Sequence, residues 1–234
     1  MGGRGPVIVF ALFPGGLALD FVGPHMVFSR IPGAHVLLAS TIGGEIRAEG
    51  GSSSADCIAF PRSIRATSSA LPAGLASMMP SSTKPSWRNC VGSLRQHASS
   101  RRCAPDRWHS VRQDCCNGKR AACHWFAREF LTAFGATPDL NRVARDGDVI
   151  TSGGVTAGID FALSIAAELI GADTAQEIQL QIEYAPAPPF NAGTPETAPL
   201  HILSNVSQRY AGSSERRRAA VKIAAARLSV EVPS

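Results

Sequence analysis

The sequence predicts an α/β fold, in which helices pack against a largely parallel sheet. Residues 6–13, "PVIVFALF", form a continuous apolar run of the kind that becomes a strand buried on both faces. Residues 15–33 follow with apolar side chains at roughly helical spacing, interrupted at Gly23-Pro24. The spaced residues are Leu19, Val22, Met26 and Val27. A buried strand that leads directly into a helix is the repeating unit of α/β proteins.

Further elements continue this order. Residues 34–40, "AHVLLAS", predict a second strand, and residues 45–57 are typical of polar strand and turn material. Residues 124–136, "HWFAREFLTAFGA", predict an amphipathic helix that ends at Gly135. Residues 141–154 then predict a hairpin of two short strands, because the Asp-Gly pair near its middle favours a tight turn.

The last third of the chain is expected to be helical with one break. Thr156 and Gly171 are the expected N-cap and C-cap of one helix, and residues 173–184 predict another. Residues 185–199 are Pro-rich and cannot form regular structure. A final helix, residues 200–228, carries a basic cluster that indicates a solvated face. A chain of 234 residues can bury one full core, so we treat residues 1–234 as a single domain.

Residues 62–117 do not fit this pattern. The formal charge of the chain is +5, yet residues 62–120 hold 11 Lys/Arg against 2 Asp/Glu, and the remainder is mildly acidic. Residues 62–117 show neither the alternation of a strand nor the period of a helix, so we expect them to be irregular. Four of the six cysteines lie there, namely Cys90, Cys103, Cys115 and Cys116.

This segment could be a zinc site or a nucleic-acid patch. Zinc ligands usually come in closely spaced pairs such as C-x2-4-C, which the adjacent Cys115-Cys116 and the isolated Cys103 do not provide. His97 and His109 would be the remaining ligands. Arginines scattered among Ser and Pro give charge without a defined binding face. We therefore predict no metal site and no nucleic-acid partner.

On either side of the segment, the chain resembles the DJ-1/PfpI superfamily, and within it the isonitrile hydratase-like branch. The resemblance is carried by residues 10–36, "FALFPGGLALDFVGPHMVFSRIPGAHV", and by residues 118–136, 150–171 and 178–199. It implies a flavodoxin-like, class I glutamine amidotransferase-like three-layer sandwich, usually a homodimer. It also implies a nucleophilic cysteine on a sharp strand-to-helix turn that reads approximately V-C-T-G-S, with a glycine-rich P-G-G loop upstream.

Neither motif is present in the chain as translated. A thiol on such a turn lies at a helix N-terminus, where free N–H groups lower its pKa. Cys103, in "RRCAPDR", is followed by Pro105 and has no neighbouring glycine for a tight turn. The upstream stretch "LPAGLAS" lacks the paired glycines. The chain therefore lacks the sharp turn that would carry the thiol, which we call the nucleophile elbow. It also lacks the glycine-rich loop that would stabilise the negative charge that develops in the reaction.

A change of reading frame accounts for both losses. Read one base out of phase, residues 101–117 permit S-V-C-T-G-S-L-A-L-G-A-A-G-L-L-Q, in which the Cys codon straddles Cys103 and Ala104. The same phase applied from Ser63 permits a string containing V-A-G-G-P-G. Two matches in one phase and in the family's order favour a frameshift over a divergent insert, which is the alternative. We predict one phase change near Pro61 and a compensating one near Gly118.

Two residues are the candidate catalytic groups. Asp20 matches the acidic position that the family places near its nucleophile, where a carboxylate could act as general acid and base. Its alternative role is a helix-start Asp favoured by the macrodipole. Cys103 is the best placed thiol, although its elbow is lost. His124 matches a family position near the active site but is expected to be a buried structural residue, and Cys57 and Cys123 are expected to be small core residues.

The resemblance implies hydration of an isonitrile to an N-substituted formamide, by a Cys nucleophile without metal or organic cofactor. Whether this chain is an enzyme is open, because the nucleophile motif is missing and the activity is expected to be absent or impaired. The alternative is a non-catalytic sensor domain like those of AraC-type regulators. The expected partners are a small isonitrile-like substrate and a second copy, with no membrane. The short apolar N-terminus and few cysteines outside the segment indicate the cytoplasm.

Overall fold

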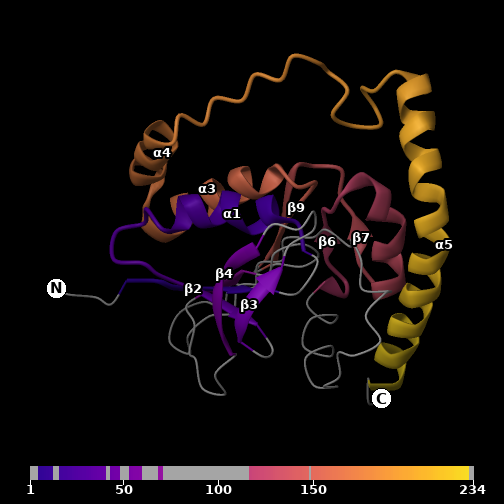
Figure 1. The fold of residues 1–234 in the computed structure, drawn as a ribbon, viewed down its shortest axis with the longest axis horizontal. Helices are drawn as coiled ribbons and strands as arrows, with labels where there is room; N and C mark the ends of the chain where they lie inside the picture. The colour runs from indigo at the N-terminus through magenta and orange to yellow at the C-terminus, as the bar shows by residue number, and fades with distance from the viewer. Residues whose placement is uncertain are drawn as a thin grey trace.

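The computed structural model describes residues 5–12, 16–40, 43–47, 53–59, 68–70, 116–147 and 149–231 of the 234-residue chain. Figure 1 shows two groups of elements, the main sheet with its helices and a smaller group that carries the last helix. No helix in these ranges combines the length and the apolar character needed to cross a membrane.

A five-stranded sheet forms the centre of the first group. Its strands are β1 (Val7–Ala11), β2 (His35–Ser40), β3 (Gly44–Arg47), β4 (Ser53–Ala59) and β5 (Ser68–Ala70). They lie in the order β3-β4-β2-β1-β5, and every pairing is parallel except the antiparallel pairing of β3 with β4. β1 therefore has a neighbour on each side, and its apolar run is buried as predicted.

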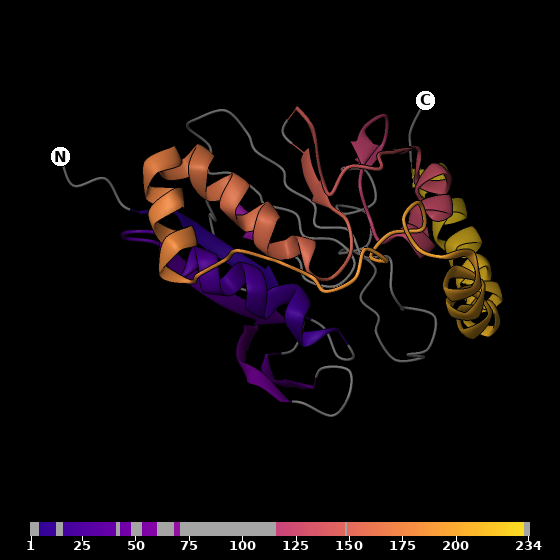
Figure 2. The same cartoon turned by 90° about the horizontal axis from the view of Figure 1, so that it is seen from above.

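Helices α1 (Ala18–Phe28) and α3 (Ala157–Ile170) lie side by side on one face of this sheet, and α4 (Ala172–Gln181) follows α3 (Figure 2). Phe10, Phe28 and Phe161 are almost fully buried between the sheet and the helices. Val9, the residue between two core positions of β1, points to the other face and packs with Ala39. The predicted strand, helix and layered α/β order are confirmed.

Helix α1 differs from its prediction. It continues through Gly23 and Pro24 without interruption. A methyl group at Gly158 of α3 would lie 2.8 Å from Cγ of Pro24, so the missing side chain at Gly158 makes room for the proline ring. The apolar residues whose spacing predicted this helix are not its core face. Leu19, Val22 and Met26 are between 42% and 44% exposed, whereas Val27 is buried.

The second group contains short elements and the last helix. These are β6 (Arg120–Ala121), the 3₁₀ helix η3 (Trp125–Phe134), β7 (Thr137–Pro138), β8 (Val143–Asp146), β9 (Val149–Ser152) and α5 (Leu200–Glu231). The predicted helix after residue 124 is thus 3₁₀ in type and ends, as predicted, at Gly135, whose φ is 72°. The predicted hairpin is the antiparallel pair β8 and β9.

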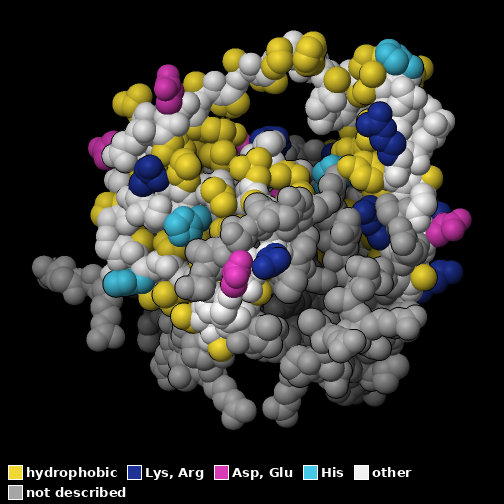
Figure 3. All heavy atoms as spheres, in the orientation of Figure 1, with side chains coloured by type: hydrophobic (Ala, Val, Ile, Leu, Met, Phe, Trp, Pro, Cys, Tyr) yellow, Lys and Arg dark blue, Asp and Glu magenta, His cyan; other side chains and the backbone are white. Residues whose placement is uncertain are grey.

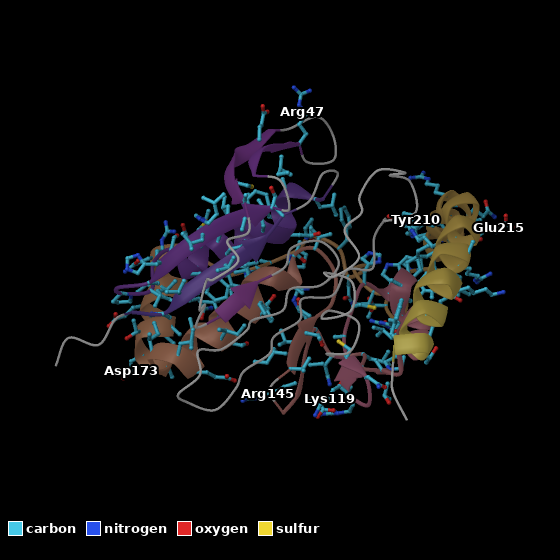
Figure 4. The ribbon with its side chains drawn as sticks, turned by 90° about the horizontal axis from the view of Figure 1, so that it is seen from below. Arg47, Lys119, Arg145, Asp173, Tyr210 and Glu215 are labelled. Carbon is cyan, nitrogen blue, oxygen red and sulfur yellow. The ribbon has the colours of Figure 1, made fainter. Side chains whose placement is uncertain are left out.

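Helix α5 packs on η3 through an aromatic cluster. Tyr210 lies 4.6 Å from the ring of Phe126, centroid to centroid, and the buried guanidinium of Arg217 lies 5.3 Å from the same ring. Arg218 adds an ion pair to Glu129. Figure 4 shows Tyr210 on the inner side of α5, with Glu215 on the outer side.

The expectation for residues 62–117 is wrong at three positions. Ser68 to Ala70 form β5, which extends the sheet beside β1 in parallel register. This short strand can form because the edge of β1 that does not pair with β2 presents backbone N–H and C=O groups, with which an extended segment can pair. Cys116 and Asn117 belong to the next described range, and Cys116 is buried. The other residues of the segment lie outside the described residues.

Candidate functional site

Asp20 lies in the first turn of α1 and is 4% exposed. Its backbone N–H donates to the carbonyl oxygen of Leu17, the residue at which the helix begins, at 3.2 Å. The carboxylate therefore lies inside the protein at the positive end of a helix dipole. This is a place where an acidic group is shielded from water and can exchange a proton with a nearby group.

The turn between β9 and α3 lies next to Asp20. A methyl group at Gly158, in the first turn of α3, would be 3.7 Å from the carbonyl oxygen of Asp20. The turn itself consists of residues 153–156. The first turns of α1 and α3 therefore lie in contact.

The β9–α3 turn is held by Arg142 and the residues around it. The carbonyl oxygen of Arg142 accepts from the N–H of Gly153 at 2.8 Å. Its guanidinium donates from Nε to Oδ2 of Asp160 at 2.6 Å and from Nη2 to Oγ1 of Thr156 at 3.1 Å. Thr156 occupies the N-cap position as predicted, but its hydroxyl binds Arg142 instead of capping the helix.

His124 lies on the other side of this turn. Its Nδ1 accepts a hydrogen bond from the N–H of Phe126 at 3.3 Å, so the imidazole caps η3. A methyl group at Gly154 would be 3.3 Å from Cδ2 of His124. His124 is half-buried, not buried as predicted, but these contacts support a structural role for it beside the β9–α3 turn.

The described thiols are core groups. Cys57, Cys116 and Cys123 are reduced and buried. Burial raises the pKa of the Cys123 thiol to about 12, although the nearby charge of Arg128 acts in the opposite direction. Its Sγ donates to the carbonyl oxygen of His124 at 3.5 Å. A thiol that stays protonated at neutral pH is a poor nucleophile. Cys57 and Cys123 both pack in clusters of buried apolar residues, so the prediction that they are core residues is confirmed.

Cys103 lies outside the described residues, so only the acidic member of the predicted pair is located. Cys115, His97 and His109 lie outside them as well. Among the residues that the structure describes, no three His, Cys, Asp or Glu side chains are grouped closely enough to hold a metal ion. Cys116, the one described member of the zinc set that the sequence analysis rejected, packs against the core of η3.

Ser152 is a buried polar residue that the sequence did not indicate. It is the last residue of β9 and is fully buried, and its Oγ has no hydrogen-bond partner among the described residues. Alternation along β9 places its side chain on the same face as Ile150, which packs in the core with α1 and α3. The stretch "ITSGG" indicates only a strand and a turn, so no sequence signal distinguishes this hydroxyl from an exposed one.

Comparisons with known proteins agree on the fold. No family model matches the chain. The chain is 51% identical over 113 residues to the isonitrile hydratase of Pseudomonas putida, a match that spans 48% of this chain and 50% of that protein. A crystal structure of a ThiJ/PfpI family protein from Pseudomonas syringae matches 93% of this chain and 90% of its own, with a TM-score of 0.75 and 28% identity. DJ-1beta of Drosophila melanogaster matches 78% of this chain and all of its own, with a TM-score of 0.57 and 19% identity.

Proposed function

The chain belongs to the isonitrile hydratase-like branch of the DJ-1/PfpI superfamily, with its flavodoxin-like α/β fold, and we propose that it derives from an enzyme that hydrates an isonitrile to an N-substituted formamide. The observation that carries the proposal is the buried Asp20 at the helix start where the branch places its acidic group. The chain spans half the length of the curated relative it matches, so the activity is a proposal for the whole protein.

The proposed reaction needs a thiolate and a group that moves protons. The thiolate attacks the isonitrile carbon, and that carbon takes a proton, which gives a thioimidate. Water then adds to the same carbon, the sulfur leaves as the thiol, and the nitrogen takes a proton to give the formamide. Asp20 would deliver the first proton and remove one from the attacking water, since it is buried beside the turn that begins α3.

We propose that the chain as translated lacks most of this activity. The sequence around Cys103 has no glycine to form the elbow that would expose and activate the thiol. Loss of a nucleophile typically costs several powers of ten in rate, because the parts of such a unit act together. The short match to the curated relative, 48% of this chain, is compatible with a middle segment in another reading frame.

The test compares two proteins, the chain as translated and one expressed from a gene whose frame is restored between Pro61 and Gly118. Formamide formation from an alkyl isonitrile is followed by mass spectrometry. The restored protein is expected to turn over and the translated chain to be at least about a thousandfold slower. Equal rates in the two proteins would contradict the proposal that the translated chain has lost its activity. A gene whose third codon bases do not permit V-C-T-G-S in the shifted frame would contradict the frameshift.

Asp20 is tested in the frame-restored protein. Asp20→Asn keeps the size of the side chain and removes its proton transfer, so kcat is expected to fall by about a hundredfold or more. Asp173→Asn is the matched control, because Asp173 also lies in the first turn of a helix but is exposed. Its kcat is expected to stay unchanged. Equal effects of the two substitutions would show that Asp20 acts only on helix stability.

A homodimer and a cytoplasmic location also stay proposals. Helix α1 supports the dimer, because Leu19, Val22 and Met26 form an exposed apolar stripe at helical spacing. A second copy of the chain would cover this stripe. Val22→Asp is expected to turn a dimer into a monomer in sedimentation velocity, and an unchanged dimer would exclude α1 from the interface.

A further inference from the structure

Ser152 carries a buried hydroxyl that the described fold does not use. The residue is 0% exposed, and its Oγ makes no hydrogen bond to any residue that the structure describes. The neighbouring Thr151 is equally buried, at 1% exposed, but its Oγ1 accepts from the N–H of Ala122 at 2.7 Å. A buried hydroxyl without a partner destabilises a fold, because it has given up its hydrogen bonds with water. Ser152 is therefore expected to bind something other than its own chain.

The position of Ser152 connects it with the start of α3. It ends β9, and the turn of residues 153–156 leads from it into that helix. Its side chain shares a face of β9 with Ile150, which packs in one cluster with residues of α1 and α3. Because α3 packs over this face, the side chain of the last strand residue lies towards the beginning of the helix. The first turn of α3 also lies beside Asp20, at Gly158, so the hydroxyl and the buried carboxylate belong to the same corner of the fold.

The groups around this corner are apolar. Ile150, Phe161 and Ala162 are buried on the same face, and Figure 3 shows hydrophobic side chains over the helices and along residues 185–199. An alkyl isonitrile and the thioimidate formed from it are uncharged, so apolar surroundings suit them. A water molecule is held in such surroundings only where polar groups bind it. Attack by water at this corner therefore needs a polar group besides Asp20.

We propose that Ser152 holds the water molecule that attacks the thioimidate. The Oγ of Ser152 accepts a hydrogen bond from one O–H of this water, and Asp20 takes the proton of the other O–H as the C–O bond forms. Asp20 then passes that proton to the nitrogen. The C–S bond breaks, and the proton of the O–H that was bonded to Ser152 goes to the sulfur, which leaves as the thiol. Ser152 neither gains nor loses a proton, and the products are the formamide and the free thiol.

Urea unfolding of the chain as translated provides the first test. Ser152→Ala is expected to leave the urea midpoint unchanged or to raise it, because no hydrogen bond within the described fold is lost. Thr151→Val is the matched control, since it removes a hydroxyl of the same strand that does bind the backbone. Its midpoint is expected to fall. A fall of similar size in both variants would show that the Ser152 hydroxyl is a structural group, which would overturn the inference.

The inference rests on the proposed function, so its kinetic test uses the frame-restored protein and an alkyl isonitrile. Ser152→Ala is expected to release formamide at least about tenfold more slowly, which corresponds to one hydrogen bond lost in the transition state. Attack by the thiolate does not involve Ser152, so intact-protein mass spectrometry should show the thioimidate adduct accumulating. Thr151→Val is expected to release formamide at the rate of the parent, without accumulated adduct.

The outcomes separate this inference from the proposed function. A Ser152→Ala variant that keeps the parent rate, or that slows without accumulating the adduct, would overturn the water site and leave the proposed function standing. A frame-restored parent that forms neither formamide nor adduct would contradict the proposed function, and the water site with it.

Discussion

At the residue scale, burial decides which side chains can react. Asp20 and Cys123 are both almost completely buried, yet they differ in their surroundings. Asp20 lies at the amino end of α1, where the helix dipole favours a negative charge. Cys123 lies among apolar side chains of the η3 core, which disfavour a thiolate. The described residues thus include a buried carboxylate at a helix start, Asp20, whereas the described thiols are buried core groups.

The raised pKa of Cys123 predicts a loss of stability at alkaline pH. In the unfolded chain the thiol has its usual pKa of 9.0, and in the folded protein its pKa is about 12. Above about pH 9 the unfolded chain loses this proton while the folded protein keeps it, so the free energy of unfolding falls as pH rises towards about 12. Cys123→Ala removes this contribution.

Urea unfolding at several pH values tests this prediction. Between about pH 8 and about pH 11, the wild-type protein is expected to lose more stability than Cys123→Ala. Lysines and tyrosines that titrate in the same range are present in both proteins, so their effects cancel in the difference. Parallel curves for the two proteins would show that Cys123 keeps an ordinary pKa.

At the element scale, the contact of α1 with α3 depends on the absence of a side chain. Gly158→Ala would place a methyl group 2.8 Å from Cγ and 3.1 Å from Cδ of Pro24. The proline ring cannot turn aside, so the helices must separate, and we expect a loss of at least about 1 kcal/mol in unfolding free energy. The measurement is the urea midpoint.

Gly212→Ala is the matched control, because Gly212 is also a helix glycine. A methyl group there has nothing within 4 Å. Alanine is expected to stabilise α5 by up to about 1 kcal/mol through helix propensity. The two substitutions should therefore move the midpoint in opposite directions. A shift of the same sign for both would mean that α1 and α3 do not pack as closely as this structure has them.

The same contact shows how much the sequence could predict. β1 was predictable because burial on both faces leaves an unbroken apolar run, and α3 because a glycine marks its end at Gly171. The continuation of α1 through Pro24 was not predictable, because it depends on Gly158, a residue of a distant helix. Asp20 was found by resemblance to a family. The burial of Ser152 follows from tertiary packing, which no local pattern records.

At the scale of the whole molecule, the core is built from both sides of residues 62–117. One cluster of buried residues combines Ile8 and Phe10 of β1 and Phe28 of α1 with Ile150 of β9 and Phe161 of α3. A second cluster joins η3, β9 and α5 but contains none of the first strands. The two flanks of the anomalous segment thus stabilise each other directly.

Phe161→Ala is expected to destabilise the first cluster by about 3–5 kcal/mol, because it leaves a cavity in a fully buried site. The amides of β1 and α3 should then exchange faster together, although they lie far apart in the sequence. Native-state hydrogen exchange measures both. Exchange that quickens in α3 while β1 stays protected would contradict a core shared by the two flanks.

The attachment of α5 has a mechanical consequence. Pulling on the carboxyl end loads the packing of Val221 on the η3 cluster and the ion pair of Arg218 with Glu129 first, and then the contact of Arg217 with Phe126; these contacts are few compared with the core of the sheet. Once α5 has detached, the Pro-rich residues 185–199 can extend to an end-to-end length of at most about 50 Å before α4 feels the force. A protease machine that pulls from this end would therefore remove the last helix while the sheet is still folded.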